Sequence, residues 1–302
     1  MEVPVPSHGL AARRQVLRTL IDSRSAILLP GATDALSART IEAIGFKAAY
    51  LSGAGLTNSQ YGLPDLAFIN CSDVVEATYR ISDVCSLPLI VDIDTGFGNA
   101  VNAYQTLRRI EAAGAAGVQI EDQIFPKRCG HFSGKAVVPI AEMEAKIKAC
   151  VDARRDSNTV VVARTDAIAV HGFSVAMERA HAMSEAGADV IFVEAPTTLS
   201  QVTQIGQLSN PTLLNIVVGG QTPMLSLDEL QKLGISLVLY ANAGLQAAMK
   251  ATHEVLSILH AEGDLKSGED RLVSFVERQE LVDKQRFDDL STLYEIRDES
   301  IN

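Results

Sequence analysis

The chain has 302 residues, 47% hydrophobic and 21% charged, so it can bury a large core and lacks the composition of a disordered chain. Its 26 Lys and Arg against 37 Asp and Glu give a net charge of −11, with no visible basic patch for nucleic acid. No apolar run approaches the ~18 residues of a membrane span, and the amino terminus has no signal-peptide pattern. The four cysteines lack C-x-x-C spacing and read as free thiols. These features predict a cytoplasmic enzyme without a nucleic-acid or membrane partner.

Eight short, mostly apolar runs are expected to be strands that are buried on both faces. Stretches with helical spacing lie between most of them, including residues 102–113, 141–155 and 174–186, and residues 243–260 follow the last run. This alternation predicts an α/β fold of the (β/α)8 TIM-type barrel. An open doubly wound sheet is the alternative, but the G-x-G-x-x-G turn that often marks it is absent. The eight runs are residues 26–30, 48–52, 89–92, 117–120, 160–163, 190–193, 213–217 and 235–240.

The domain organisation that follows is a catalytic barrel over residues 1–261 and a charged helical extension over residues 262–302. Within the barrel, residues 122–139 form a longer connection than a barrel usually has between a strand and a helix, which favours a functional gating loop. The extension is expected to pack on another surface, such as a neighbouring subunit, through Leu272, Val273, Val276, Leu281, Phe287, Leu290 and Leu293.

Acidic residues follow the strands at the end of a barrel where active sites lie. Asp92 and Asp94 are two residues apart at the end of the third run, and an extended strand would point both to one side. Glu121 ends the fourth run, and Asp65 lies in a loop. Each acid alone could cap a helix. Together, their hard oxygen ligands favour a site for Mg²⁺, with Mn²⁺ possible.

Arg164, at the end of the fifth run, has two interpretations that the sequence leaves open. It could bind a substrate carboxylate through two parallel hydrogen bonds. It could equally form a salt bridge with an acid at the same rim, such as Asp166 or Glu194.

A cysteine with charged neighbours lies inside the long loop, in the segment Lys127-Arg-Cys-Gly-His. The cations and the imidazole should lower the pKa of the Cys129 thiol, which could then protonate a carbanion. The alternative, a small buried hydrophobic residue, is the interpretation given to Cys71, Cys85 and Cys150. A zinc site is disfavoured because the Cys129 and His131 pair has no second pair at ligand spacing.

Five segments together resemble the isocitrate lyase/phosphoenolpyruvate mutase superfamily, and the resemblance covers the whole barrel. The fourth segment is specific to the lyase branch and is lacking in the phosphonate-forming mutases, which disfavours a phosphomutase; a phosphonate hydrolase or mutase of the same superfamily stays open as a rival. The segments are Tyr50-Leu-Ser-Gly-Ala-Gly, Val91-Asp-Ile-Asp-Thr-Gly-Phe-Gly, Ile120-Glu-Asp-Gln, Lys127-Arg-Cys-Gly-His and Ala163-Arg-Thr-Asp.

The resemblance implies roles for these residues in the cleavage of a small dicarboxylate. Asp92 would bind Mg²⁺ directly, and Asp65, Asp94 and Glu121 would hold its waters. Cys129 would be the general acid, and Tyr50 a candidate base for the substrate hydroxyl. Further catalytic groups would be Lys127, His131 and Arg164. Substrate contacts would come from Ser52, Gly53, Ala54, Arg128, Gly130, Phe132, Glu194 and Asn215.

The same resemblance implies an assembly. Members of the family exchange their last helix between subunits in a dimer of dimers. The extension from residue 262 fits that arrangement, so a homotetramer is expected.

Phe132 directs the choice of substrate, because methylisocitrate lyases usually have Arg at this position, where a third carboxylate favours cationic surroundings. It favours a substrate with two carboxylates and an apolar substituent, 2,3-dimethylmalate, cleaved to pyruvate and propionate. Oxaloacetate acetylhydrolase, which yields oxalate and acetate, is the alternative, although Ala241 offers no hydroxyl to a hydrated oxo group. Val218 stands where the branch usually has Glu, so the chain lacks one polar group near the site. Methylisocitrate lyase, or a catalytically inactive barrel that serves as an oligomeric interaction protein, also stay open.

Overall fold

The computed structural model describes residues 9–127 and 134–295 and contains a closed barrel of eight parallel strands. Each strand pairs with the next along the chain, and β8 closes the ring on β1 with Leu237 opposite Ile27. The predicted barrel is confirmed and the open sheet is excluded. The strands are β1 (Ile27–Ala32), β2 (Ala49–Leu51), β3 (Leu89–Asp92), β4 (Gly117–Glu121), β5 (Val160–Thr165), β6 (Val190–Val193), β7 (Thr212–Asn215) and β8 (Leu237–Tyr240).

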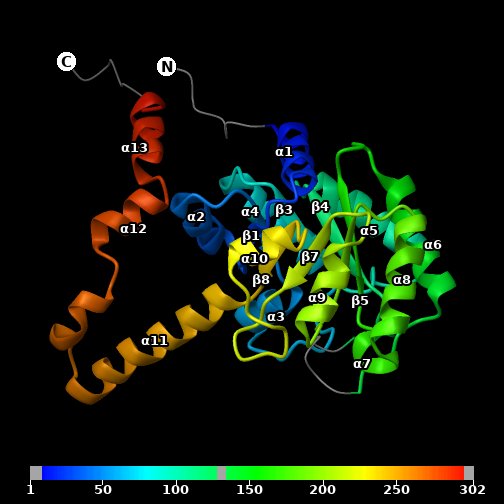
Figure 1. The fold of residues 1–302 in the computed structure, drawn as a ribbon. Coiled ribbons are helices and arrows are strands. Elements are labelled where there is room, and N and C mark those ends of the chain that lie inside the picture. Colours follow the sequence, from blue (N-terminus) through cyan, green and yellow to red (C-terminus); the bar gives the residue numbers. More distant parts are fainter. Residues whose placement is uncertain (1–8, 128–133, 296–302) are drawn as a thin grey trace, which may run out of the picture. The chain divides into compact units, whose positions relative to one another are not determined.

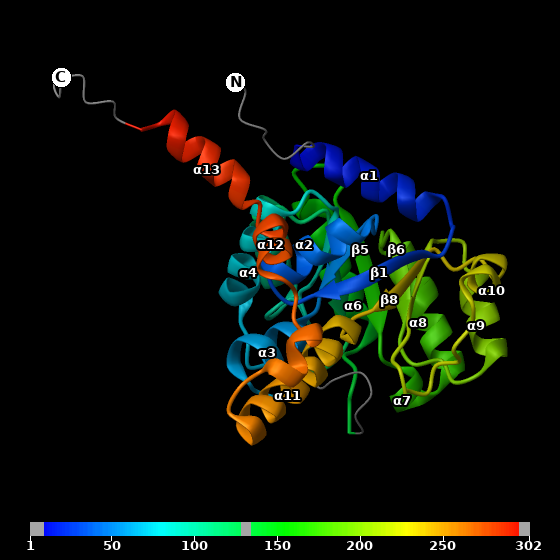
Figure 2. The same ribbon diagram turned by 90° about the vertical axis from the view of Figure 1, so that its left-hand side faces the viewer.

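Helices surround the strands of the barrel (Figures 1 and 2). In chain order they are α1 (Leu10–Asp22), α2 (Ala35–Ile44), α3 (Gly53–Tyr61), α4 (Cys71–Val84), α5 (Ala100–Ala112), α6 (Ile140–Ala153), α7 (Ile168–His171), α8 (Phe173–Glu185), α9 (Leu199–Gly206) and α10 (Leu227–Lys232). Along the chain, α11 (Ala243–Glu262) follows β8.

Several barrel helices begin at a side chain that caps the first turn. Asp34 caps α2, Asn70 caps α4 and Asn99 caps α5, each by accepting a backbone N–H of that turn. Such caps satisfy amide groups that have no partner inside the helix. They fix where each connection ends and therefore how far the chain after each strand extends around the rim.

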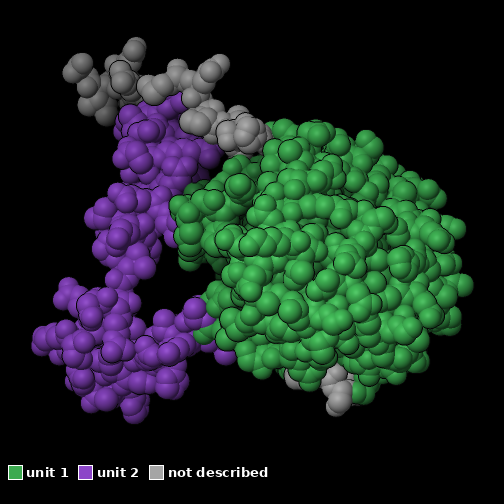
Figure 3. Space-filling view, in the orientation of Figure 1, with its two compact units in different colours: residues 1–246 green, residues 247–302 purple. Residues whose placement is uncertain are grey.

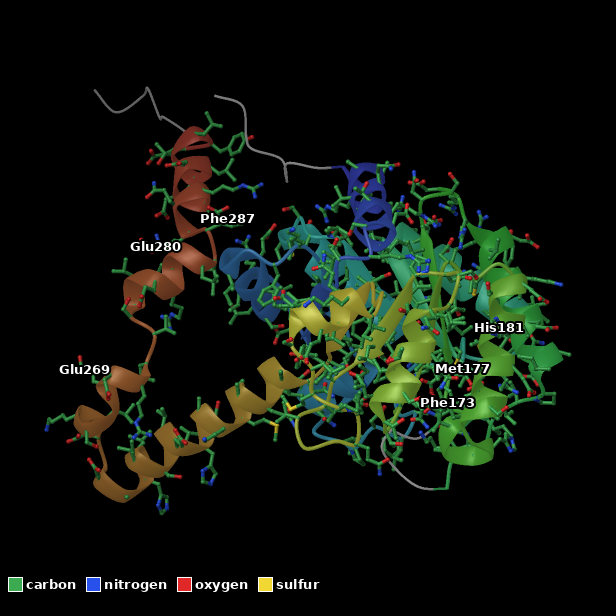
Figure 4. The ribbon with its side chains drawn as sticks, viewed as in Figure 1. Phe173, Met177, His181, Glu269, Glu280 and Phe287 are labelled. Atoms are coloured by element: carbon green, nitrogen blue, oxygen red, sulfur yellow. The ribbon has the colours of Figure 1, made fainter. Side chains whose placement is uncertain are left out.

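Two layers of apolar side chains hold the barrel together. One layer lies between the strands and the helices; Phe173 and Met177, one turn apart on α8, pack against it (Figure 4). The other fills the barrel interior and includes Ile90 and Phe192. Leu17 and Ile21 of α1 belong to this interior cluster, so α1 acts as a plug for the barrel core.

The chain separates into two compact units, residues 1–246 and 247–302 (Figure 3). The second unit contains most of α11, the 3-10 helix η1 (Lys266–Arg271), α12 (Phe275–Leu281) and α13 (Lys284–Leu293). Glu269, Glu280 and Phe287 mark these segments in Figure 4. Within the described part of the chain, no helix combines the length and apolarity that crossing a membrane requires. The expected boundary at residues 261 and 262 stays a prediction.

We predict that Leu17→Ala, which cuts a fully buried side chain of the α1 plug, lowers the free energy of unfolding by roughly 2–5 kcal/mol, the usual cost of such a cavity. Urea unfolding followed by circular dichroism measures this loss. Val16→Ala is the matched control, because Val16 is the preceding residue and is 40% exposed. Equal losses in both variants would show that α1 does not stabilise the barrel core.

Candidate active site

A cavity opens where the carboxyl ends of the strands meet, which is where a parallel barrel places its active site. Ten residues predicted from the sequence line it, together with four that were not. The lining residues are Tyr50, Ser52, Ala54, Asp65, Asp92, Glu121, Lys127, Arg164, Glu194, Asn215, Val217, Leu239, Ala241 and Asn242. Arg128, Cys129, Gly130, His131 and Phe132 lie outside the described residues.

Asp92, at the end of β3, organises the acidic part of the site. Its Oδ1 accepts the backbone N–H of Asp94 at 3.0 Å, and its Oδ2 accepts that of Gly53 at 3.3 Å. The expectation that an extended strand aligns Asp92 and Asp94 is wrong, because β3 ends at Asp92 and Asp94 has a φ of 49°. A tight turn brings the two carboxylates together. Gly53 fits closely against both, since a Cβ there would lie 3.1 Å from Asp94 Oδ1 and 3.2 Å from Asp92 Oδ2.

Lys127 bridges two of these acids. Its Nζ lies 2.5 Å from Asp65 Oδ1 and 2.9 Å from Asp94 Oδ1, and its side chain is 4% exposed. Burial by itself lowers the pKa of Lys127, but attraction to Asp94 and the other carboxylates outweighs burial and holds the pKa well above its ordinary value. For the acid Asp94, burial has the opposite effect and raises the pKa to about 6, although the positive charge of Lys127 opposes this shift. Lys127 is therefore a permanent cation at the acidic cluster.

Arg164 takes part in both interactions that the sequence left open. Its guanidinium lines the cavity, and it also pairs with rim acids. Nε and Nη2 donate to the two oxygens of Asp166 at 2.8 and 3.1 Å. Nε lies 3.5 Å from Glu121, and Nη2 lies 3.3 Å from Glu194. The salt bridges thus hold the guanidinium at the cavity wall, where it can meet an anion.

Tyr50 projects from β2 into the same cavity and is 2% exposed. Its hydroxyl donates to Gln119 Oε1 at 2.5 Å. Burial, and then the negative charge of Asp92, raise the pKa of Tyr50 well above its ordinary value. Tyr50 is thus buried beside the acidic cluster, and its role as the base that accepts a substrate proton stays a prediction.

The residues of the acidic cluster fit a hydrated divalent cation. Asp94 Oδ2 and Glu121 Oε1 are buried, and neither has a hydrogen-bond partner among the described residues. Buried polar atoms normally have partners, so these oxygens are suited to accept hydrogen bonds from metal-bound water. Over residues 9–127 and 134–295, no three His, Cys, Asp or Glu side chains form a ready ligand cage.

Amide and hydroxyl groups also line the cavity. Asn215 Nδ2 donates to Glu194 Oε1 at 3.4 Å. Ser52 caps α3 by accepting the N–H of Gly55 at 3.1 Å, and its hydroxyl donates to Asn242 Oδ1 at 3.4 Å. The amino terminus of α3 thus opens beside the cavity, in the orientation that favours a bound carboxylate.

Sequence reasoning missed two kinds of residue. Gln119 lies in β4 two positions before Glu121, so the two-residue period of a strand could have identified it as inward-facing. The lining residues Val217, Leu239 and Asn242 carry no local signal of a functional role. They are recognised only because β7 and β8 close the ring beside Ser52.

The family model described as phosphoenolpyruvate phosphomutase matches residues 17–260. The chain is 38% identical over 279 residues to 2,3-dimethylmalate lyase of Eubacterium barkeri, covering 92% of this chain and 96% of that relative. It is 42% identical over 268 residues to 2-methylisocitrate lyase of Aeropyrum pernix, covering 88% and 86% of the two chains.

Solved structures lead to the same family. Oxaloacetate acetylhydrolase in complex with 3,3-difluorooxalacetate superposes with a TM-score of 0.88 at 34% identity, covering 93% of this chain and 97% of the other. Phosphonopyruvate hydrolase in complex with oxalate and Mg²⁺ gives 0.85 at 33% identity, covering 93% and 99%. Both values are far above those of a chance resemblance. The chain therefore belongs to the phosphoenolpyruvate mutase/isocitrate lyase superfamily, and its curated relatives place it among the carbon–carbon lyases.

Proposed function

We propose that this chain is a Mg²⁺-dependent lyase that cleaves 2,3-dimethylmalate to pyruvate and propionate. The observation that carries the proposal is the mixed character of the cavity. Polar groups such as Asp92 and Arg164 share it with the apolar side chains of Val217, Leu239 and Ala241. A 2-hydroxy dicarboxylate with methyl substituents presents the same combination of groups.

Asp92 would bind the metal, and Asp65, Asp94 and Glu121 would hold its waters. The partnerless oxygens of Asp94 and Glu121 support this assignment, as does the Mg²⁺ in the hydrolase complex above. When bound, Mg²⁺ supplies positive charge that stabilises the negative charge developing on the substrate oxygens.

The chain's own groups would orient the substrate around that charge. The amino terminus of α3, with Ser52, Gly53 and Ala54, would receive the carboxylate of the 2-hydroxy acid end. Arg164 would stabilise charge on the adjacent oxygen. Tyr50, whose hydroxyl hydrogen is donated to Gln119, would lie beside the same oxygen and stays the candidate base for the substrate 2-hydroxyl. Glu194 and Asn215 would contact the remote carboxylate, together with His131.

Cleavage would begin as the 2-hydroxyl loses its proton, after which the C2–C3 bond breaks and the hydroxyl carbon becomes the ketone of pyruvate. The electron pair of that bond remains on the propionate fragment, and Cys129 would give it a proton. Arg128, Gly130 and Phe132 would complete the substrate site, and Lys127 would hold the start of their loop at the acidic cluster. The roles assigned to residues 128–133 rest on the family resemblance.

We also propose that the chain assembles as a homotetramer, a dimer of dimers that exchanges C-terminal helices. The second unit supports this, because many of its large apolar side chains are exposed to solvent, as is typical of a surface that contacts another protein. Leu272, Val273, Val276, Phe287 and Leu293, all predicted contact residues, are between 47% and 69% exposed.

Oxaloacetate acetylhydrolase is the second candidate, favoured by the TM-score of 0.88 to a solved enzyme of that name. Against it, Ala241 at the end of β8 lines the cavity and brings no hydroxyl for a hydrated oxo group. Methylisocitrate lyase is the third, supported by the 42% identity to a relative of that name.

We predict that a direct comparison of substrates separates these candidates. Purified protein with Mg²⁺ receives 2,3-dimethylmalate, 2-methylisocitrate or oxaloacetate, and the products are followed by NMR. Pyruvate and propionate should form with the highest kcat/KM. Oxalate and acetate as the main products would replace the proposal with oxaloacetate hydrolysis. Succinate from 2-methylisocitrate would replace it with the third candidate.

We predict that Cys129→Ser lowers kcat by roughly 10²–10⁴-fold, the usual contribution of a positioned general acid. Binding of Mg²⁺ and of oxalate should persist, since neither requires the proton. Cys71→Ser is the control, because Cys71 begins α4 and is not a lining residue of the cavity. Turnover of Cys129→Ser at the wild-type rate would remove Cys129 as the acid.

We predict that Gly53→Ala weakens Mg²⁺ binding by roughly tenfold, or about 1.4 kcal/mol, because the added methyl group displaces the Asp92 and Asp94 carboxylates. Isothermal titration calorimetry measures the dissociation constant. Gly9→Ala is the control, since a Cβ at Gly9 meets nothing within 4 Å. An unchanged dissociation constant would show that these carboxylates do not hold the metal.

A further inference from the structure

Lys135 is a buried cation to which the proposed mechanism gives no task. Its side chain is 2% exposed, and its Nζ lies 2.7 Å from Asp166 Oδ1. Removing an ammonium group from water carries a large free-energy cost unless a partner compensates it. Asp166 is that partner, and its side chain is completely buried.

Asp166 connects Lys135 to the wall of the active site. The Oδ1 atom that accepts Lys135 also accepts Arg164 Nη2 at 3.1 Å, and Oδ2 accepts Arg164 Nε at 2.8 Å. A carboxylate that receives a guanidinium through two parallel bonds fixes its plane. Lys135 occupies a third donor position on the same carboxylate, so the orientation of Asp166 depends on two cations.

Hydrogen bonds from neighbouring residues restrict the movement of Asp166. Asp166 donates its N–H to Asp122 Oδ1 at 2.9 Å, and Asp122 Oδ2 accepts Thr165 Oγ1 at 2.7 Å and Arg179 Nε at 2.8 Å. Arg179 also donates to the carbonyl of Val138 at 2.9 Å.

The segment that carries Lys135 is anchored on the other side as well. Gln123 and Val137 form an antiparallel bridge, and Ile124 donates its N–H to the carbonyl of Ala136 at 2.9 Å. These backbone contacts between residues 123–124 and 136–137, which begin shortly after β4, hold Lys135 next to Asp166.

Charge around Arg164 explains why a second cation is needed. Asp166, Glu121 and Glu194 lie within 3.5 Å of its guanidinium, three carboxylates against one positive charge. Without compensation, these acids would cancel the attraction of Arg164 for an incoming anion. Lys135 neutralises one of the three, Asp166, and is not itself a lining residue of the cavity.

We propose that Lys135 is a positioning residue that acts through Asp166 to hold the Arg164 guanidinium in place and positively charged toward a carboxylate ligand. This rests on the proposed function only in taking Arg164 as a group that meets an anionic substrate. Lys135 itself touches no substrate.

The test compares oxalate binding by the Mg²⁺-loaded wild-type chain, Lys135→Met and Lys146→Met, measured by calorimetry. Lys146 is the matched control, because its side chain is 4% exposed and pairs with Glu142 on α6. Lys135→Met should weaken oxalate binding roughly tenfold, the loss expected when one hydrogen bond to a charged group disappears. Lys146→Met should bind oxalate as the wild-type chain does. Mg²⁺ affinity should stay the same in both, and with the preferred substrate Lys135→Met should raise KM more than it lowers kcat.

A second background shows whether Lys135 acts through Asp166. In Asp166→Asn, the carboxylate that links the two cations is gone, so adding Lys135→Met should weaken oxalate binding by less than about twofold, the mark of residues that share one network. A full tenfold loss in that background would overturn the proposal. So would a Lys135→Met variant that binds oxalate like the wild-type chain. Failure of the wild-type chain itself to bind oxalate would instead count against the proposed function and, with it, against the role of Lys135.

Discussion

The need to balance negative charge buried at one end of a barrel governs the rest of this site. Seven carboxylates gather there, each at most 8% exposed as a residue: Asp65, Asp92, Asp94, Glu121, Asp122, Asp166 and Glu194. Over residues 9–127 and 134–295, four cations contact them, namely Lys127, Lys135, Arg164 and Arg179. Full ionisation of this described set would leave an excess of three negative charges, and burial makes such an excess costly. A divalent cation relieves most of it. Binding of the divalent cation and the stability of the rim are therefore linked, because the same carboxylates bind the cation and repel one another when it is absent.

The cations divide this negative charge into two regions with different chemistry. In the first region, Lys127 forms ion pairs with Asp65 and Asp94, beside the proposed metal. In the second, Arg164 pairs with Asp166 and Glu194, Lys135 with Asp166, and Arg179 with Asp122. Glu121 lies between them, 3.5 Å from Arg164 and with one oxygen that has no partner among the described residues. One region is thus prepared for a cation and the other for an anion. A dicarboxylate that chelates a metal through one end needs both.

Sequence reasoning succeeded where the signal is local. The third and sixth runs match β3 and β6 at both ends, because a short apolar segment between polar loops fixes a buried strand without reference to the rest of the chain. The polar residues after those strands were found for the same reason. Sequence reasoning failed where a contact joins residues that are far apart in the chain. Lys135 and Asp166 are 31 positions apart, and no pattern pairs them. Asp94 was expected on the right rim for the wrong reason, since a positive φ follows from tertiary packing and not from strand alternation.

The α1 plug has a kinetic meaning beyond stability. Leu17 and Ile21 join the packed barrel interior beneath the cavity, so that interior offers no passage toward the amino-terminal ends of the strands. Substrate and both products must then share the opening at the carboxyl ends. Under the proposed function, the two fragments of the cleaved substrate would leave through this one opening, one after the other. The departure of the second fragment, and not only the breaking of the bond, would then contribute to the duration of a full catalytic cycle.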